Sequence, residues 1–90
     1  MEKIIITVVG KDRVGIIGRV CTFLSNANIN ILDISQTIVS GFFNMIVIAD
    51  IKEASLSFDD AAEGLKELGD EQGFEIRTQR EDIFTAMHRI

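Results

Sequence analysis

The segment from Gly10 to Arg19, GKDRVGIIGR, contains the residue types that phosphate-binding and catalytic loops use. Gly10 and Gly15 have the G-x-x-x-x-G spacing of a phosphate-binding loop. In that motif Lys and then Ser or Thr follow, because these side chains reach the terminal phosphates and the metal. Here Ile16 and Ile17 follow instead, and the glycines do not match G-x-G-x-x-G. We therefore expect no nucleotide site in this segment.

The rest of the chain lacks the side chains that hydrolases and metal sites usually use. The one histidine, His88, stands near the C-terminus, and no serine has a visible histidine partner. Asp59 and Asp60 stand where a helix is expected to begin, so they favour its dipole and not a metal site. The one cysteine, Cys21, forms no internal disulfide and no Cys-x-x-Cys pair, and its apolar neighbours favour core packing. We expect no catalytic residue, no metal site and no cofactor.

An acylphosphatase-like hydrolase is the enzymatic alternative. The segment VVGKDRVGIIGR resembles the phosphate-holding loop of acylphosphatases, with Arg19 as the anchor and Asn44 as the residue that places water. This sequence departs from that loop at Arg13, where a glutamine is expected, and at Gly18, where an aromatic residue is expected. Asp12 also puts a carboxylate where an acidic substrate would bind, and that like-charge contact would oppose binding. The alternative is therefore disfavoured.

Two hydrophobic periodicities alternate along the chain and predict its strands and helices. Asp12 is expected to cap the first helix and Ser57 the second, which ends at Gly69 or Gly73. The segment SNANIN over 25–30 breaks the helical pattern, and asparagine tolerates the left-handed conformation that is common where helices end. The expected elements in chain order are a buried strand over 4–9, a helix over 16–27, an alternating strand from 31, a tight turn at 40–41, a strand over 42–51, a helix from 57 and a strand over 74–79.

The strand that begins at Ile31 has a clean alternation, which predicts a half-buried strand. One face carries Leu32, Ile34, Gln36 and Ile38, and the other carries Asp33, Ser35 and Thr37. In the first helix, Gly18 is expected to let the helix approach the sheet closely.

The order β-α-β-β-α-β predicts an α+β fold, the ferredoxin-like sandwich, in which a four-stranded antiparallel sheet has both helices on one face. The expected domain covers residues 1–80, and residues 81–90 form a short C-terminal helix. Its apolar residues at helical spacing are Ile83, Phe84, Met87 and Ile90. Because the first strand is apolar on both faces, the uncovered sheet face is expected to meet this helix and a second copy of the chain. We therefore expect a homodimer or a higher oligomer.

The charge balance narrows the choice of partners. The formal net charge is −5 and the pI is about 4.7, so the basic footprint of nucleic-acid binding is missing. RNA-recognition domains share the expected element order, but they need aromatic residues on the first strand, and here that strand has none. No apolar run approaches the ~20 residues of a membrane span, and the acidity disfavours an anionic membrane surface. With no export signal visible, we expect a cytoplasmic protein.

Two motifs together resemble the ACT domain, the regulatory module by which many enzymes of amino-acid metabolism sense amino acids. They are DRVGI at Asp12–Ile16 and ANINI at Ala27–Ile31, and the resemblance extends to about Arg80. The length and the C-terminal helix resemble the small stand-alone ACT proteins of bacteria and archaea. The resemblance implies a non-enzymatic module that binds an amino acid or a similar metabolite and regulates a partner enzyme in trans.

In that family the ligand usually lies between this loop and the second strand of a neighbouring copy. Gly15 leaves backbone N–H groups open to a ligand carboxylate, and the amides of Asn28 and Asn30 suit a zwitterion. By resemblance, the ligand-binding residues are Asp12, Arg13, Val14, Gly15, Asn28, Asn30 and Ile31. The alternative is a purely structural dimerisation or adaptor module, in which Asp12 and Asn28 only cap and Gly15 and Gly18 only pack.

Overall fold

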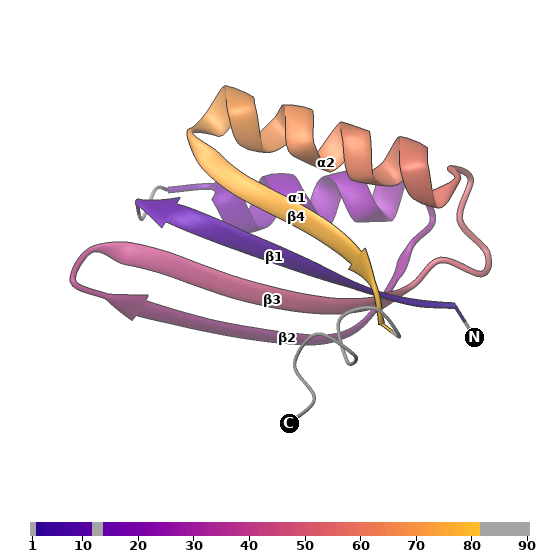
Figure 1. Cartoon of the computed structure of the whole chain (residues 1–90), viewed down its shortest axis with the longest axis horizontal. Coiled ribbons are helices and arrows are strands. Elements are labelled where there is room, and N and C mark those ends of the chain that lie inside the picture. Colours follow the sequence, from indigo (N-terminus) through magenta and orange to yellow (C-terminus); the bar gives the residue numbers. More distant parts are fainter. Residues whose placement is uncertain (1, 12–13, 82–90) are drawn as a thin grey trace.

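A computed structural model describes residues 2–11 and 14–81 of the chain (Figure 1). It confirms the predicted order of elements and the ferredoxin-like sandwich, with both helices on one side of the sheet (Figure 1). The elements are β1 (Lys3–Lys11), α1 (Ile16–Asn26), β2 (Asn30–Val39), β3 (Phe42–Asp50), α2 (Phe58–Gln72) and β4 (Phe74–Arg80). The predicted final helix, with Ile83 to Ile90, lies outside the described residues.

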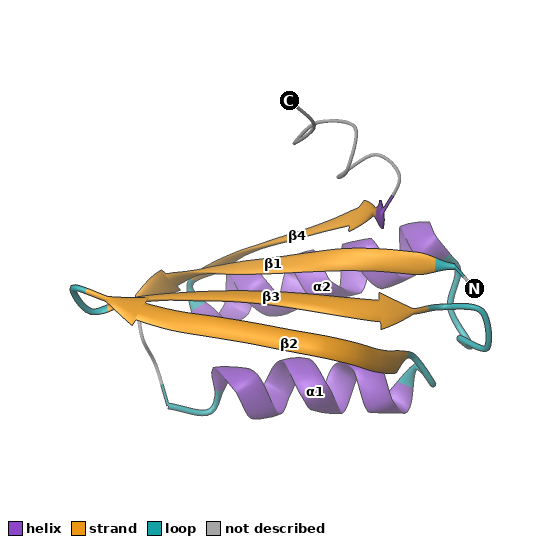
Figure 2. Cartoon of the chain, turned by 90° about the horizontal axis from the view of Figure 1, so that it is seen from below, coloured by secondary structure: helices purple, strands orange, loops and turns teal. Residues whose placement is uncertain are grey.

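The sheet has the strand order β2-β3-β1-β4, and all its pairs are antiparallel (Figure 2). β1 is a central strand, as its apolar residues on both faces predicted. The core lies between the sheet and the helices, where every second residue of β3 is buried. Phe43 packs edge-on against Phe74, with ring centroids 6.1 Å apart. No helix of the described part of the chain is long and apolar enough to cross a membrane.

The prediction that β2 is half-buried is wrong. It lies at the edge of the sheet, and every residue from Leu32 to Val39 is exposed. A register shift between Ile31 and Asp33 adds one residue to β2. Ile31 therefore pairs with Ala49 and Ile34 with Val47, so both isoleucines lie on the face that the helices cover. The unbroken alternation predicted from Ile31 does not hold at this bulge.

Positive φ values and a local hydrogen bond define the hairpin turn, both termini of α2 and the segment after α1. Ser40 and Gly41 both have positive φ, 52° and 79°, as a tight hairpin turn requires. The Asp60 N–H donates to Ser57 Oγ at 3.1 Å, which confirms the predicted cap of α2. Gly73, at φ 77°, ends that helix. Within the segment SNANIN, where the helical pattern was predicted to break, Asn28 is left-handed at φ 56°.

The start of α1 differs from the prediction that Asp12 caps it. Asp12 lies outside the described residues, and the N-cap position is occupied by Gly15 at φ 91°. A glycine has no side chain that could accept from the first helical turn, and within residues 2–11 and 14–81 no side chain makes a cap hydrogen bond to α1. The positive φ is the physical reason for a glycine here, because L-residues with a side chain are strained in that region.

The close packing that was predicted for Gly18 occurs instead at Gly64 and Gly69. A Cβ atom at Gly18 would meet no atom within 4 Å, so this residue does not bring α1 toward the sheet. A Cβ at Gly64 would lie 2.6 Å from the ring of Phe23, which is the approach between α2 and α1. A Cβ at Gly69 would lie 2.7 Å from the carbonyl oxygen of Phe74, which is the approach of α2 to β4.

We expect opposite effects of Gly69→Ala and Gly18→Ala on the free energy of unfolding. At position 69 the methyl group overlaps backbone that cannot move freely, so we expect a loss of about 1–3 kcal/mol. At position 18 the methyl group is unhindered and alanine favours the helix, so we expect a gain of about 0.5–1 kcal/mol. Urea denaturation of both variants measures the two values. Equal effects at the two sites would contradict the packing described for α2 and β4.

Candidate functional site

The predicted ligand-binding residues lie at the two ends of α1. Val14 and Gly15 precede this helix, whereas Asn28 and Asn30 follow it. The 11 residues of α1 separate the two groups by about 16 Å of helix. One chain therefore does not bring them together. Figure 2 shows α1 along the β2 side of the sheet, with its start at the end where the β2–β3 turn lies.

Three further predicted residues have different surroundings. Asp12 and Arg13 lie outside the described residues. Ile31 is half-buried and packs against the core, so its side chain supports the start of β2.

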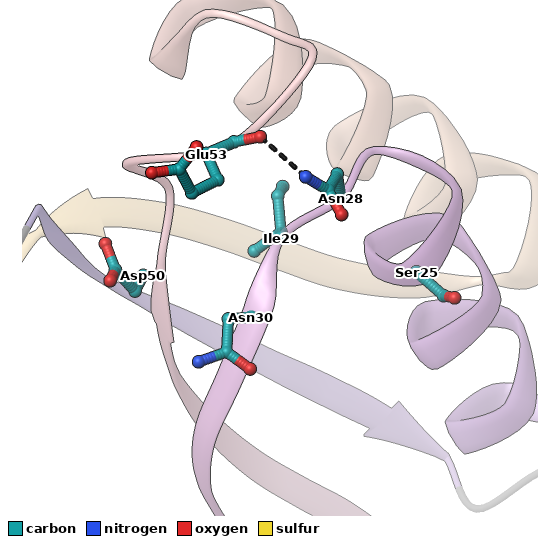
Figure 3. A pocket seen from close by; sticks show the side chains of 6 residues that line it. All are labelled: Ser25, Asn28, Ile29, Asn30, Asp50 and Glu53. Carbon is teal, nitrogen blue, oxygen red and sulfur yellow. Dashed lines mark hydrogen bonds between the residues drawn. The ribbon is translucent and has the colours of Figure 1, made fainter.

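A cavity of about 430 Å³ lies at the end of α1, where β2 begins and β3 ends (Figure 3). We call it the strand half-site; its lining residues are Ser25, Asn28, Ile29, Asn30, Asp50 and Glu53. Asn30 and Asp50 are direct partners across the β2–β3 ladder. Two carboxyl groups and two amides thus surround this cavity, and their oxygens accept hydrogen bonds. Such a lining suits an ammonium group and opposes a free carboxylate.

Hydrogen bonds hold the loops of the strand half-site in place. The Asn28 side-chain N–H donates to the carbonyl oxygen of Glu53 at 2.8 Å (Figure 3). The Ser55 N–H and hydroxyl both donate to the carbonyl oxygen of Ala27, at 2.9 and 3.2 Å. These bonds join the loop after α1 to the loop after β3. The left-handed turn at Asn28 is thereby fixed, and Asn30 starts its strand in a defined place.

Asp50 is the best-anchored charge of the strand half-site. Its Oδ1 accepts from the backbone N–H of Lys52 at 3.0 Å and of Glu2 at 3.1 Å. The Lys52 N–H is the main cause that lowers the pKa of the Asp50 carboxyl below its ordinary value, and the Glu2 N–H adds to it. Asp50 is therefore a carboxylate at neutral pH, as an ammonium-binding group must be.

We expect the lowered pKa of Asp50 to make the protein less stable in acid. A carboxyl group whose pKa is lowered in the folded state stabilises the folded protein. This stabilisation is fully present above the ordinary aspartate pKa of about 3.9, and it is lost as the pH falls through the lowered pKa. Asp50→Asn removes this part of the pH dependence. Urea denaturation between about pH 6 and about pH 3 should give a shallower acid slope for the variant than for the wild type. Identical slopes would show that the carboxyl gains nothing from its two N–H donors.

The other end of α1 has the opposite electrostatic character; we call Val14, Gly15 and the first turn of α1 the loop half-site. Among the described residues, none is acidic in that first turn and no side chain caps it, so its N–H groups and helix dipole can attract an anion. Val14 is fully exposed. A cavity of about 590 Å³ extends from Gly15 past Arg19 along α1.

The outer edge of β2 carries an apolar surface beside both half-sites. Its most exposed large side chains are Leu32, Ile34, Ile38 and Val39, joined by Phe42 across the turn. Asp33 is the one charged residue in the strand. Apart from the bulge at Ile31/Asp33 and the single charge of Asp33, this long apolar edge has no proline or lysine that would prevent pairing with another strand. Among the described residues, no strand pairs with this edge.

The residues of the hydrolase alternative are not brought together. Arg19 lies on α1, whereas Asn44 on β3 alternates with the buried residues that face the helices and so points to the other side of the sheet. Among the described residues, no group of three or more His, Cys, Asp or Glu side chains could hold a metal ion.

The sequence motifs did not indicate four residues that line the strand half-site: Ser25, Ile29, Asp50 and Glu53. For Asp50 a signal existed: the two-residue turn at Ser40-Gly41 sets the hairpin register and places residue 50 or 51 opposite Asn30. No pattern indicated Glu53, because its place depends on the loop that Asn28 binds.

Comparisons with known proteins agree with this fold. A family model described as the ACT domain matches residues 2–79. A UPF0237 protein of Bifidobacterium longum is 59% identical over 90 residues, and the match covers 100% of both chains. The structure of an ACT domain protein from Streptococcus pneumoniae has a TM-score of 0.81 at 32% identity and covers 92% of this chain and 93% of that one. A formyltetrahydrofolate deformylase from Pseudomonas syringae pv. tomato has a TM-score of 0.82 at 24% identity, over 89% of this chain and 28% of that one; this likeness shows the fold alone.

Proposed function

This chain belongs to the ACT domain family, a regulatory fold that binds small ligands, and from that premise we propose that it is a homodimer that binds a free amino acid or a similar zwitterion. Its role is to regulate a partner enzyme in trans, without catalytic activity of its own. The main support is the pair of complementary half-sites at opposite ends of α1. The strand half-site suits an ammonium group, and the loop half-site suits a carboxylate.

The proposed dimer forms through the apolar edge of β2. Antiparallel pairing of two β2 strands about a two-fold axis would bury the exposed isoleucines and give the open backbone groups of both edges partners. Leu32, Ile34 and Ile38 are 40%, 39% and 57% exposed in the single chain, so each has surface to bury. Asp33 is the one charged residue of β2, so repulsion between two copies is limited to this single position.

This pairing would complete a site from both chains. At one end of the sheet, next to the loop half-site, Phe42 pairs with Val39 on one side and with Lys11 on the other. Asn30, Asp50 and Lys3 align at the other end, next to the strand half-site. An antiparallel partner reverses the two ends. The partner's strand half-site would then lie at the end of the sheet where this chain has its loop half-site.

Each group has a role in the proposed ligand complex. Asp50 and the side-chain oxygen of Asn30 accept from the ligand ammonium group, while Asn28 keeps its loop closed against Glu53. The N–H groups after Gly15 donate to the ligand carboxylate, helped by the positive end of α1. Val14 borders the ligand side chain, and by the family resemblance Asp12 and Arg13 also contribute to ligand binding. Ile31 supports Asn30 from the core.

A dimerisation module without ligand is the second candidate function. The apolar β2 edge favours it, because burial of this edge would stabilise a dimer whether or not the half-sites are used. Ligand addition separates the two candidates.

We expect an amino acid to raise the free energy of unfolding. A ligand at 100 times its Kd adds about 2.7 kcal/mol if it binds only the folded protein. Thermal unfolding of the purified protein with each proteinogenic amino acid at millimolar concentration measures the effect. Matched controls are the amine and the carboxylic acid of the same carbon skeleton, which should each give little shift because each fills one half-site. If none of the amino acids gives a shift, the protein is the dimerisation module.

A further inference from the structure

A second groove runs along the opposite edge of the sheet, between α2 and β4. It has a volume of about 410 Å³. On the side of α2 its wall consists of Ala62, Lys66 and Asp70, which follow one another at four-residue steps along one face of the helix. Ile76 and Thr78, two residues apart, contribute from β4 and lie on the same face of the strand. The groove therefore follows the direction of β4.

Hydrogen-bonding capacity is left unused along this groove. β4 is the last strand of the sheet, and among the described residues no strand pairs with its outer edge. Thr78 Oγ1 is buried and has no hydrogen-bond partner in the described part of the chain. An added strand would give backbone partners to the edge of β4 and could satisfy the Thr78 hydroxyl.

The charge beside the groove is strongly negative. α2 carries six acidic residues and one lysine: Asp59, Asp60, Glu63, Glu67, Asp70 and Glu71 against Lys66. The cations that line the groove are already paired, because Lys66 Nζ lies 4.0 Å from Asp70 and Arg77 lies 2.8 Å from Glu75. The remaining acids of α2 have no cation within this helix to balance them. A chain that lies in the groove is therefore attracted if it is basic.

A second copy of this chain fits this edge poorly. Symmetric pairing of two β4 strands would place α2 beside the α2 of its partner, because each helix flanks its own β4. Two helices with this excess of acidic residues would repel one another. The β2 edge, with a single Asp33, lacks this barrier. The β4 edge thus disfavours a second copy of this chain, whereas the β2 edge does not.

We propose that the groove between α2 and β4 docks an extended basic segment of a partner protein, which adds to β4 as a fifth strand. Alternate side chains of that segment enter the groove over Ala62 and Ile76. Its lysines or arginines lie against the acidic residues of α2. The surface lies on the edge of the sheet opposite to the two half-sites, so its test and the test of amino-acid binding can fail independently.

A synthetic peptide of about nine residues that alternates lysine with valine is the test ligand, because this length matches the strands of a typical sheet. Its counterpart alternates glutamate with valine. We expect the basic peptide to shift backbone amide resonances of β4 and α2, and to slow hydrogen exchange along β4. At high ionic strength the affinity should fall at least about tenfold, because salt screens exposed charges. The acidic peptide should give no shift.

Two variants and a matched control make the test specific. Ala62→Leu fills the groove with an apolar side chain that the helix tolerates, and should abolish the peptide shifts while the rest of the spectrum stays native. Glu63→Lys should weaken binding about fivefold, whereas Glu2→Lys, with the same charge change away from α2, should leave it unchanged. Shifts on β2 in place of β4, equal binding of both peptides, or full binding to Ala62→Leu would overturn the proposal.

Discussion

Ile34→Lys is expected to convert the proposed homodimer into a monomer. Ile34 lies on the outer strand β2 and is 39% exposed in the single chain, so a proposed β2–β2 interface buries it. A lysine at this position would carry an unpaired charge into that interface, which costs several kcal/mol and raises the dimer dissociation constant about 100-fold or more. Sedimentation velocity at micromolar concentration should give the mass of one chain for the variant and of two chains for the wild type.

Ile46→Lys is the matched control for the interface. Ile46 is 41% exposed, but it lies on β3 between Thr7 and Ser35, on the sheet face that the helices do not cover. This variant should remain a dimer, because its lysine points to solvent beside the proposed interface. The reverse result, a monomeric Ile46→Lys and a dimeric Ile34→Lys, would show that two copies meet through the open sheet face.

Loss of amino-acid binding is expected from a single change in either half-site. Val14→Glu places a carboxylate beside the N–H groups that bind the ligand carboxylate, and such a like-charge contact costs several kcal/mol. Asn30→Ala removes an acceptor of the ligand ammonium, and a hydrogen bond to a charged group contributes about 1.5–3 kcal/mol. We therefore expect isothermal titration to show affinity losses of about 100-fold or more for Val14→Glu and about 10- to 100-fold for Asn30→Ala.

Two controls exclude unspecific effects of these changes. Val9→Glu adds the same charge on the sheet face that the helices leave open, and Asn44→Ala removes the same amide from β3. Both should bind the ligand as the wild type does. Equal losses in the controls and the site variants would mean that stability, and not the half-sites, determines binding.

Elements whose signals are local were predictable from the sequence. The cap at Ser57 with Asp60, the turn at Ser40-Gly41 and the break of the helical pattern at SNANIN each act within a few residues, and the structure has all three. The burial of β2 was not predictable, because alternation indicates a strand but not its place at the edge of the sheet. The role of Gly18 was not predictable either, because only the packing of the helices distinguishes it from Gly69.

The candidate site was only partly predictable, because part of it depends on how the helices and strands are arranged in the fold. Gly15 and Asn30 belong to motifs that the sequence displays, and both lie at an end of α1 as expected from the order of elements. Their separation by the whole helix follows from the fold, and it is what makes a second chain necessary for the proposed site. Asp50 joins Asn30 through strand pairing over a distance of 20 residues, which a motif search does not detect.

The shared site can be tested most directly by mixing Val14→Glu with Asn30→Ala and titrating the mixture with the amino acid that stabilises the wild type. A mixed dimer keeps one intact site, made from the loop half-site of the Asn30→Ala chain and the strand half-site of the Val14→Glu chain. Since half of the dimers are mixed and each keeps one of two sites, we expect about a quarter of the wild-type binding capacity at wild-type affinity. A mixture that binds no more than either variant alone would contradict a site formed between two copies.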